Sequence, residues 1–404
     1  MEGFEMGKVK VLTARQAADL IKDGDTVTLS GFVANGIAEA LNAAAEERFL
    51  ETGHPKDLTL FWVAGTGNKD GSHADHYAHE GMVKKVIGGH FNFVPKICEM
   101  LSENKIEGYN VPQGAIAQML RDNAAHKVGT ISHVGIGTFA DPRNGGGRLS
   151  EKTKEDIVKV IELEGQEQLF YPRIPLDVAF IRGTYADELG NITLEKEMAP
   201  LDATSQAMAV HNNGGLVVVQ VERVVKAGHL DPKLVKIPGI YVDAVVECPA
   251  DDPKQSQSIN CTYDPAYAGN TQVPVSSLEP KKLDAKKIIG RRAAMELKKN
   301  VVVNLGVGVP EWVSSVAAEE GVADEMTLTV ECGPVGGVPG GGLRFGGSVN
   351  AQAYMDEGYQ FDFYDGGGLD LCFLGLAEVD NNGDVNVSRL GTRITGSGGF
   401  TNIS

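Results

Sequence analysis

Two stretches of the chain, 193 residues apart, repeat the same pattern of residue types without a gap. Residues 176–180 (Leu-Asp-Val-Ala-Phe) precede Asp187, and residues 369–373 (Leu-Asp-Leu-Cys-Phe) precede Asp380 at the same spacing. Each copy reads as a strand, a turn and a second strand. Because whole elements recur in the same order, the sequence predicts two similar open α/β domains formed by internal duplication.

Glycines at the ends of predicted strands support the α/β class. Apolar runs at 26–32 and 58–63 each lead into a glycine, and an Ala- and Glu-rich helix is predicted over about 37–51. Strands that alternate with helices through such turns are typical of βα units. Weaker sequence similarities to these two strands occur at 304–306 and 326–328, which extends the repeat along the second half.

The same comparison predicts the domain limits. The first domain covers 1–248, a linker or long excursion rich in Pro, Asp and Ser covers 249–282, and the second domain covers 283–404. The first domain continues into a buried-type strand at 214–221, whose counterpart would lie beyond Ser404. We therefore expect a C-terminally truncated chain whose second domain lacks its C-terminal strands, or a partner that supplies them.

Composition excludes several classes of function. A net charge of −17 provides no basic field for nucleic acid. No apolar run is long enough to span a membrane, and the first residues lack the apolar core of a signal peptide, so a cytoplasmic location is expected. The five cysteines are scattered without a C-x-x-C pair, which argues against a disulfide framework or a zinc ribbon.

Two clusters of charged or metal-binding residues have simpler explanations. His73, His76 and His79 have helical spacing and can share one face, but no fourth ligand follows, so no metal is expected and a solvated helix face is the alternative. A basic helix that begins near 284 (Lys286, Lys287, Arg291, Arg292) is predicted to be a solvated face. The glycines form no G-x-G-x-x-G fingerprint for a dinucleotide.

Glu331 is the main candidate for chemistry. It ends the apolar run 326–330, and eight of the seventeen residues from 331 to 347 are glycine. Glycine lets a backbone pass close to a ligand, and charged residues at strand ends carry chemistry in many α/β proteins. The alternative is a surface acid before a flexible loop. In the looser alignment Val63 occupies the position of Glu331, so only one half carries the carboxylate.

Several motifs in order resemble the family I coenzyme A transferases, in the propionate/acetate (also lactate) branch with both halves fused. They cover nearly the whole chain: Pro112-Gln113-Gly114, Lys236 to Asp243, Asn304 to Pro310, Glu331 within Glu-x-Gly, Gly341 to Gly346, and Phe361 to Asp370. The Ser-Glu-Asn-Gly box of the family reads Val330-Glu331-Cys332-Gly333 here, so Cys332 is an unusual neighbour that can compete as a nucleophile.

The resemblance implies a CoA-transferase that moves CoA from a short-chain acyl-CoA to a short-chain carboxylate by a ping-pong mechanism. Glu331 would be the nucleophile that forms a γ-glutamyl-CoA thioester. Coenzyme A would be a substrate, with no permanently bound cofactor, and a homo-oligomer is expected. The oxyanion and carboxylate would be positioned by Gln113, Asn386 and Gly398, and CoA would be bordered by Gly306, Val307, Gly308, Val309, Pro310, Gly396 and Gly399.

Two other functions are compatible with the same residues. An acyl-CoA hydrolase would use the same thioester and admit water. A non-catalytic CoA-binding fragment would form no adduct on Glu331.

Overall fold

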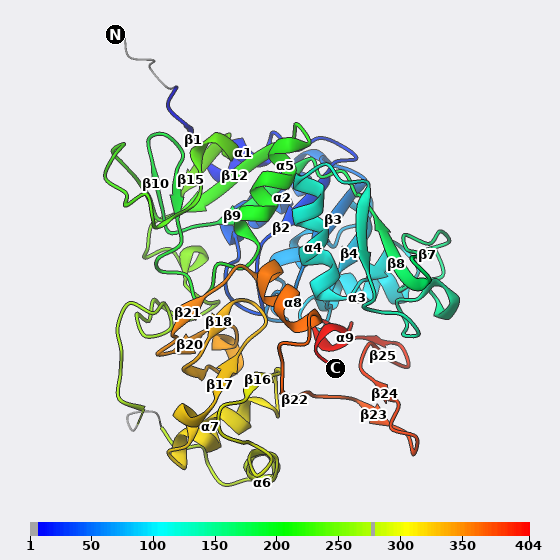
Figure 1. Cartoon of the computed structure of the whole chain (residues 1–404). Helices are drawn as coiled ribbons and strands as arrows, with labels where there is room; N and C mark the ends of the chain where they lie inside the picture. The colour runs from blue at the N-terminus through cyan, green and yellow to red at the C-terminus, as the bar shows by residue number, and fades with distance from the viewer. Residues whose placement is uncertain (1–6, 276–278) are drawn as a thin grey trace.

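A large parallel sheet dominates the computed structural model, which describes residues 7–275 and 279–404 (Figure 1). Its strand order is β1-β15-β12-β9-β2-β3-β4-β5, and every neighbouring pair is parallel. The strands are β1 (Lys10–Leu12), β2 (Thr26–Leu29), β3 (Leu58–Trp62), β4 (Val83–Gly88), β5 (Glu107–Asn110), β9 (Val178–Arg182), β12 (Leu216–Val221) and β15 (Ala244–Glu247).

Helices cover both faces of this sheet, so its strands are apolar on both sides. Along β12, Val217 and Val219 pack into one core while Val218 packs into the other. Buried parallel strands of this kind form continuous apolar runs in the sequence. The first core contains α4 (Gln113–Ala124) and α5 (Ala203–Asn212), and the second contains α1 (Ala14–Ala18), α2 (Glu39–Thr52) and α3 (Pro95–Ser102).

Two smaller sheets flank the large one. One has the order β13-β10-β11-β14 and the other β6-β8-β7. Their strands are β6 (Gly129–Ser132), β7 (Lys159–Leu163), β8 (Gln166–Pro172), β10 (Tyr185–Asp187), β11 (Ile192–Thr193), β13 (Arg223–Val225) and β14 (Val235–Ile237).

The second half forms a smaller sheet with the order β21-β18-β17-β16-β22, in the yellow and orange part of Figure 1. Its parallel strands β17, β16 and β22 are neighbours in the same order as β3, β2 and β9. These correspondences support the proposed duplication, and the boundaries at 248 and 283 remain predictions. The strands are β16 (Val302–Leu305), β17 (Thr327–Thr329), β18 (Pro334–Val335), β21 (Ala353–Tyr354) and β22 (Leu371–Phe373).

Short hairpins and four helices complete the second half. The helices are α6 (Ala285–Ala294), α7 (Glu311–Glu319), α8 (Glu357–Asp365) and α9 (Phe400–Ile403). The hairpins pair β19 (Val338–Pro339) with β20 (Ser348–Val349), β23 (Glu378–Val379) with β24 (Val385–Asn386), and β25 (Arg389–Leu390) with β26 (Arg393–Ile394). None of the described helices has the length and apolar character that crossing a bilayer requires.

The two halves meet where α4 packs against α8 (Figure 1). Gly114, in the first turn of α4, donates its N–H to Asn402 Oδ1 at 3.0 Å. A Cβ at Gly114 would lie 2.6 Å from the ring of Phe361, so the helices approach closely only because this residue is glycine. The contact holds the carboxyl ends of the large sheet and of the parallel strands β17, β16 and β22 toward each other.

The segment predicted as a linker is partly packed into the fold; residues 276–278 of it lie outside the described residues. Arg182, buried at the end of β9, donates Nη2 to the carbonyl of Gln255 at 2.9 Å. Ser258 donates its hydroxyl to the carbonyl of Leu343 in the glycine-rich stretch. This part of 249–282 is therefore an excursion that contacts both halves.

The prediction of a common histidine face is wrong. Residues 73–77 form a 3₁₀ helix, in which His73 is buried against Trp62. His76 instead contacts the carboxylates of Glu39 and Glu46 at 2.8 and 2.5 Å, and His79 contacts Glu46. The three residues do not share one regular helix, because the 3₁₀ helix ends at Tyr77 before His79 and His73 has a φ of 56°.

The basic helix α6 is also only partly solvated. Lys287 is buried and contacts Glu319 at 2.5 Å and the carbonyl of Lys281 at 2.7 Å. Its ammonium thus fixes α6 to α7, which the sequence pattern did not predict.

Candidate active site

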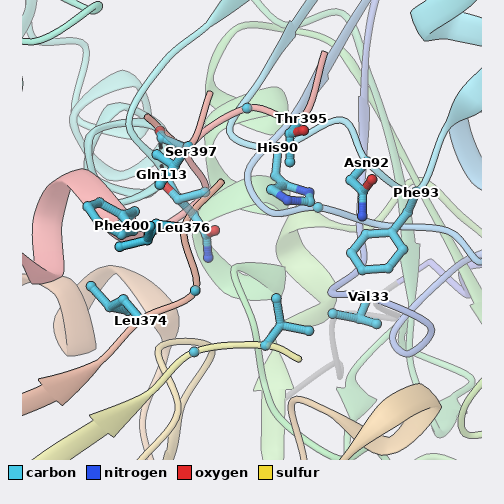
Figure 2. Close-up of a pocket in the computed structure, with 18 of the residues that line it drawn as sticks. Val33, His90, Asn92, Phe93, Gln113, Leu374, Leu376, Thr395, Ser397 and Phe400 are labelled. Carbon is cyan, nitrogen blue, oxygen red and sulfur yellow. Dashed lines mark hydrogen bonds between the residues drawn. The ribbon is translucent and has the colours of Figure 1, made fainter. Parts of the chain in front are cut away.

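A pocket of about 370 Å³ opens between the carboxyl ends of the large sheet and of the parallel strands of the smaller sheet (Figure 2). From the large sheet, Gly65, His90 and Gln113 line it, after β3, β4 and β5 respectively. From the smaller sheet, Gly306 and Glu331 line it, after β16 and β17. Parallel strands place ligand sites at this edge, so two such edges facing each other create a natural binding crevice.

Glu331 is the one acidic residue among the described residues that line this pocket. Its side chain is only 8% exposed, and burial raises its pKa to about 7. Asn304 Nδ2, on the neighbouring strand β16, lies 3.4 Å from Glu331 Oε2 and partly offsets that rise. A carboxylate with so few donors is poorly solvated, which makes it a stronger nucleophile when it is ionised.

A buried polar network fixes Asn304. Its Nδ2 also lies 3.3 Å from the hydroxyl of Tyr364 on α8, and that hydroxyl donates to Thr329 Oγ1 at 2.8 Å. Gln360 Nε2 donates to the same hydroxyl at 2.8 Å. Helix α8 therefore orients the amide that contacts Glu331.

A second acidic group lies behind Gln113. The Nε2 of Gln113 donates to Glu357 Oε1 at 2.6 Å, and Glu357 in turn shares a hydrogen bond with Asp202. Burial raises the pKa of Glu357 well above its usual range, and the charges of Asp202 and Glu331 raise it further. The raised pKa favours the neutral carboxylic acid form of Glu357, which holds the side chain of Gln113.

The segment 395–399 forms another wall and is bound to the large sheet by its backbone. Gly398 donates its N–H to Gly89 O at 2.8 Å, and Phe91 donates to Thr395 O at 2.7 Å. Ser397 donates its N–H to Asn110 Oδ1 at 3.0 Å. The N–H groups of Gly306 and Gly396 donate to Phe373 O and Ser388 O. Amides that are committed in this way do not serve as oxyanion donors.

The structure brings together most of the residues predicted for the site, but not all of them. Those that line the pocket are Gln113, Gly306, Val307, Glu331, Gly396, Gly398 and Gly399. Gly308, Val309 and Pro310 lie outside its lining, at the start of α7, where Glu311 Oε1 accepts from the Gly308 N–H at 2.7 Å.

Asn386 lies away from Glu331. Its Nδ2 donates to Glu378 Oε2 and to the carbonyl of Arg389 within the β23–β24 hairpin region, at 2.9 and 2.8 Å. It lines a neighbouring pocket together with His133 and Asp365. Hydrogen bonds within the hairpin region occupy the Asn386 amide and hold it away from Glu331. The geometry therefore does not support the predicted role of Asn386 in positioning the oxyanion or carboxylate.

The expectation that Cys332 can compete as a nucleophile is not supported either. Its side chain is fully buried beside Phe32 and Phe345, outside the pocket lining, and its thiol donates to Gly346 O at 3.2 Å. Burial raises the pKa of the Cys332 thiol well above its usual range. The reactive thiolate is therefore strongly disfavoured.

The glycine-rich stretch after Glu331 is folded rather than a loose loop. It includes β18, the β19–β20 hairpin and a 3₁₀ turn at Gly342–Arg344. Gly333 donates its N–H to Val330 O at 3.1 Å in a turn and has a φ of 134°. Residues other than glycine rarely adopt this φ. This turn directs the Glu331 side chain toward the pocket and that of Cys332 away from it.

Sequence reasoning missed three residues of the site. Asn304 stands out as a lone polar residue in the apolar run 301–305, and His90 follows Gly88-Gly89 at a strand end, so both carried a signal. Glu357 lies in a polar stretch and carried none. In the described ranges, 7–275 and 279–404, no group of His, Cys, Asp or Glu is arranged to hold a metal ion.

Similarity to known proteins shows the family of this chain. Residues 11–248 match the family described as Coenzyme A transferase. The acetate CoA-transferase YdiF of Escherichia coli K12 is 43% identical over 401 residues, which cover 98% of this chain and 75% of that protein. The chain belongs to the coenzyme A transferase family. The resemblance predicted from its motifs is thereby confirmed, and the protein is an enzyme of the CoA-transferase class.

Other relatives of this CoA-transferase agree. The caffeate CoA-transferase of Acetobacterium woodii is also 43% identical, with 98% of this chain and 76% of that protein covered. Among solved structures, the acyl-CoA transferase YdiF of E. coli O157:H7, in a thioester complex with CoA, aligns with a TM-score of 0.91. That alignment has 42% identity and covers 98% of this chain and 75% of that one. The predicted α/β fold is confirmed by this likeness.

Proposed function

We propose that this CoA-transferase moves CoA from a short-chain acyl-CoA to a free short-chain carboxylate of the acetate, propionate or lactate type. The reaction is ping-pong and passes through a γ-glutamyl-CoA thioester on Glu331. The observation that carries the proposal is a single, buried acidic side chain at the junction of the two sheet edges. Relatives named acetate and caffeate CoA-transferases, and a solved relative in a thioester complex with CoA, support it.

The chemistry suits a carboxylate nucleophile. Glu331 attacks the thioester carbonyl, the C–S bond breaks, and a mixed anhydride and CoA thiolate form. The thiolate then attacks the Glu331 carbonyl, which releases the first acid and leaves CoA on Glu331 as a thioester. The incoming carboxylate reverses both steps, so no water and no permanently bound cofactor take part.

The pocket lining favours transfer over hydrolysis. Side chains of Phe93, Phe345 and Leu374 line it alongside Glu331. Polar groups such as Asn92 and Gln113 also line the pocket, but apolar side chains beside Glu331 disfavour bound water there, which would protect both the anhydride and the thioester. Its volume of about 370 Å³ suits a small acid together with the end of a pantetheine arm. The predicted roles of Gly306 and Val307 at this arm are part of the proposal, as are the cytoplasmic location and homo-oligomeric assembly.

Mass spectrometry of the protein after incubation with propionyl-CoA tests the proposal. We expect a CoA-sized adduct that maps to the peptide with Glu331 and disappears, with formation of acetyl-CoA, when acetate is added. Glu331→Gln should form no adduct, and Cys332→Ser should form it at the wild-type rate.

Two results would contradict the proposal in different ways. Release of CoA that does not depend on acetate would identify a hydrolase instead. Absence of an adduct from the wild-type protein would indicate a non-catalytic CoA-binding chain.

A further inference from the structure

His90 lines the pocket, but the reaction described above gives its imidazole ring no role. It follows β4, and Figure 2 shows its ring between Gln113 and Phe93. Its backbone is fixed because Trp62 Nε1 donates to its carbonyl oxygen at 3.1 Å. The ring itself lies 5.5 Å from that of Phe93, centre to centre.

The two ring nitrogens have different surroundings. Nδ1 is enclosed and has no hydrogen-bond partner among the described residues. A Cβ at Gly65 would lie 2.8 Å from Cγ of the ring and closer still to Nδ1, so a Cα–H bond of Gly65 points at Nδ1. A lone pair on Nδ1 accepts this weak contact, whereas an N–H there would clash with it. The proton of a neutral ring therefore resides on Nε2.

The ring is neutral. Burial lowers the pKa of His90 to about 4, and the positive charge of Lys69 lowers it further. A neutral imidazole with its proton on Nε2 is a hydrogen-bond donor that brings no positive charge next to Glu331.

The position of the ring matches the need for a donor. Gly398 lies between His90 and Gln113: a Cβ there would be 3.6 Å from His90 Cδ2 and 3.4 Å from Gln113 Oε1. The Gly398 N–H itself donates to Gly89 O and is not available to a substrate. The atom beside Cδ2 in the ring is Nε2, and His90 lines the same pocket as Gly398 and Glu331.

We propose that His90 donates its Nε2–H to the substrate oxygen that becomes negative when Glu331 attacks the thioester carbonyl. His90 is thus a catalytic residue of the reaction proposed above, and the inference rests on that reaction. The enclosed Nδ1 without a hydrogen-bond partner lowers the stability of the folded state, and the fold retains this cost beside the reacting carbonyl.

The test compares the rate of thioester formation on Glu331 from propionyl-CoA in three variants. His90→Leu keeps bulk and removes the donor, and we expect a rate lower on the order of 100-fold. His90→Gln returns an amide N–H near Nε2 and should recover much of that loss. Gly65→Ala keeps an allowed backbone but displaces the ring, so it should also be slow although His90 is intact.

Thermal unfolding separates catalysis from structure. His90→Leu removes an unpaired buried nitrogen, so its stability should equal or exceed that of the wild type while its rate falls. A wild-type rate in His90→Leu or in Gly65→Ala would overturn the assignment of His90. A wild-type protein that forms no Glu331 adduct would instead overturn the proposed function itself, which the same measurement shows.

Discussion

Glu331 combines two properties that oppose each other. The ionised side chain is needed for attack, yet burial raises its pKa to about 7. The folded state therefore binds a proton at this position more tightly than the unfolded chain, whose value is near 4.5. The ionised nucleophile destabilises the fold, as is common where a site is prepared for chemistry.

This conflict predicts a pH-dependent gain in stability for Glu331→Gln. Below pH 4.5 the wild-type residue is protonated in both states, and the variant should match it. As the pH rises from 4.5 through 7 the wild type loses stability, so at pH 8 the variant should be more stable by about 3 kcal/mol. Urea unfolding at pH 4, 6 and 8 measures this, and the exposed Glu151→Gln controls for the change in net charge. An equal difference at all three pH values would contradict the prediction.

Glu357 is expected to act through its neutral form. Glu357→Gln should keep near wild-type activity, because its amide can still accept from Gln113 and donate to Asp202. Glu357→Leu leaves both partners unpaired and should lower stability by about 1–3 kcal/mol and reduce kcat/KM for the acceptor acid. Steady-state kinetics with acetate, together with thermal melts, distinguish the two variants. Equal defects in both would show that the charged form matters.

At this scale the sequence indicated the nucleophile but not what surrounds it. Glu331 ended an apolar run before a cluster of glycines, and Gln113 lay in a recognisable motif. Glu357 could not be predicted, since its significance arises only when α8 packs against α4. Asn386 shows the reverse: its residue type suited the role, and the hairpin fold directs it elsewhere.

At the scale of elements, the contact between α4 and α8 determines the shape of the pocket. Gln118 Nε2 donates to Asp365 Oδ2 at 2.9 Å, and Arg121 forms an ion pair with Asp362. These polar contacts flank the tight approach at Gly114. Both helices also carry site residues, Gln113 and Glu357, so their spacing and the chemistry are linked.

Gly114→Ala is expected to force the two helices apart. The added Cβ would lie 2.6 Å from Phe361, so stability should fall by about 1–3 kcal/mol, although alanine is the better helix former. The turnover of acyl-CoA should fall as well, because Gln113 and Glu357 separate. Gly358→Ala, where the nearest atom is 3.6 Å away, is the matched control in α8 and should be stable. A Gly114→Ala variant as stable as the wild type would refute the tight contact.

Sequence patterns predicted the elements better than their details. The predicted strands at 26–32 and 58–63 correspond to β2 and β3, and the predicted helix over 37–51 corresponds to α2. The predicted histidine face is wrong because the helical segment ends at Tyr77, before His79, and His73 is buried against Trp62. The buried ammonium of Lys287 likewise depends on Glu319, which is distant in the sequence.

At the scale of the molecule, two sheet edges from distant parts of the chain enclose one pocket. Repeat analysis predicted two similar halves, and the neighbour order β17-β16-β22 agrees with β3-β2-β9. How the edges face each other was beyond the sequence, since it depends on contacts such as Gly114 with Asn402. The wall at 395–399 belongs to the second half by sequence, yet Thr395, Ser397 and Gly398 are also hydrogen-bonded to the first half.

This arrangement predicts linked hydrogen exchange across the molecule. Formation of the Glu331 thioester with propionyl-CoA should slow amide exchange in residues 86–93 and 395–400 together, because backbone hydrogen bonds join them. The β7–β8 hairpin, none of whose residues line the pocket, should exchange at an unchanged rate and is the internal control. Protection of only one of the two pocket segments would contradict the linkage.

The hydrogen bond from Trp62 to the carbonyl of His90 also provides an optical signal. The protein has two tryptophans, and Trp62 is fully buried whereas Trp312 is partly exposed. In a Trp312→Phe background, the indole emission of Trp62 would report on the backbone of the residue that faces the substrate. Fluorescence during a single turnover could then follow the arrival of acyl-CoA and the release of the acid without any label.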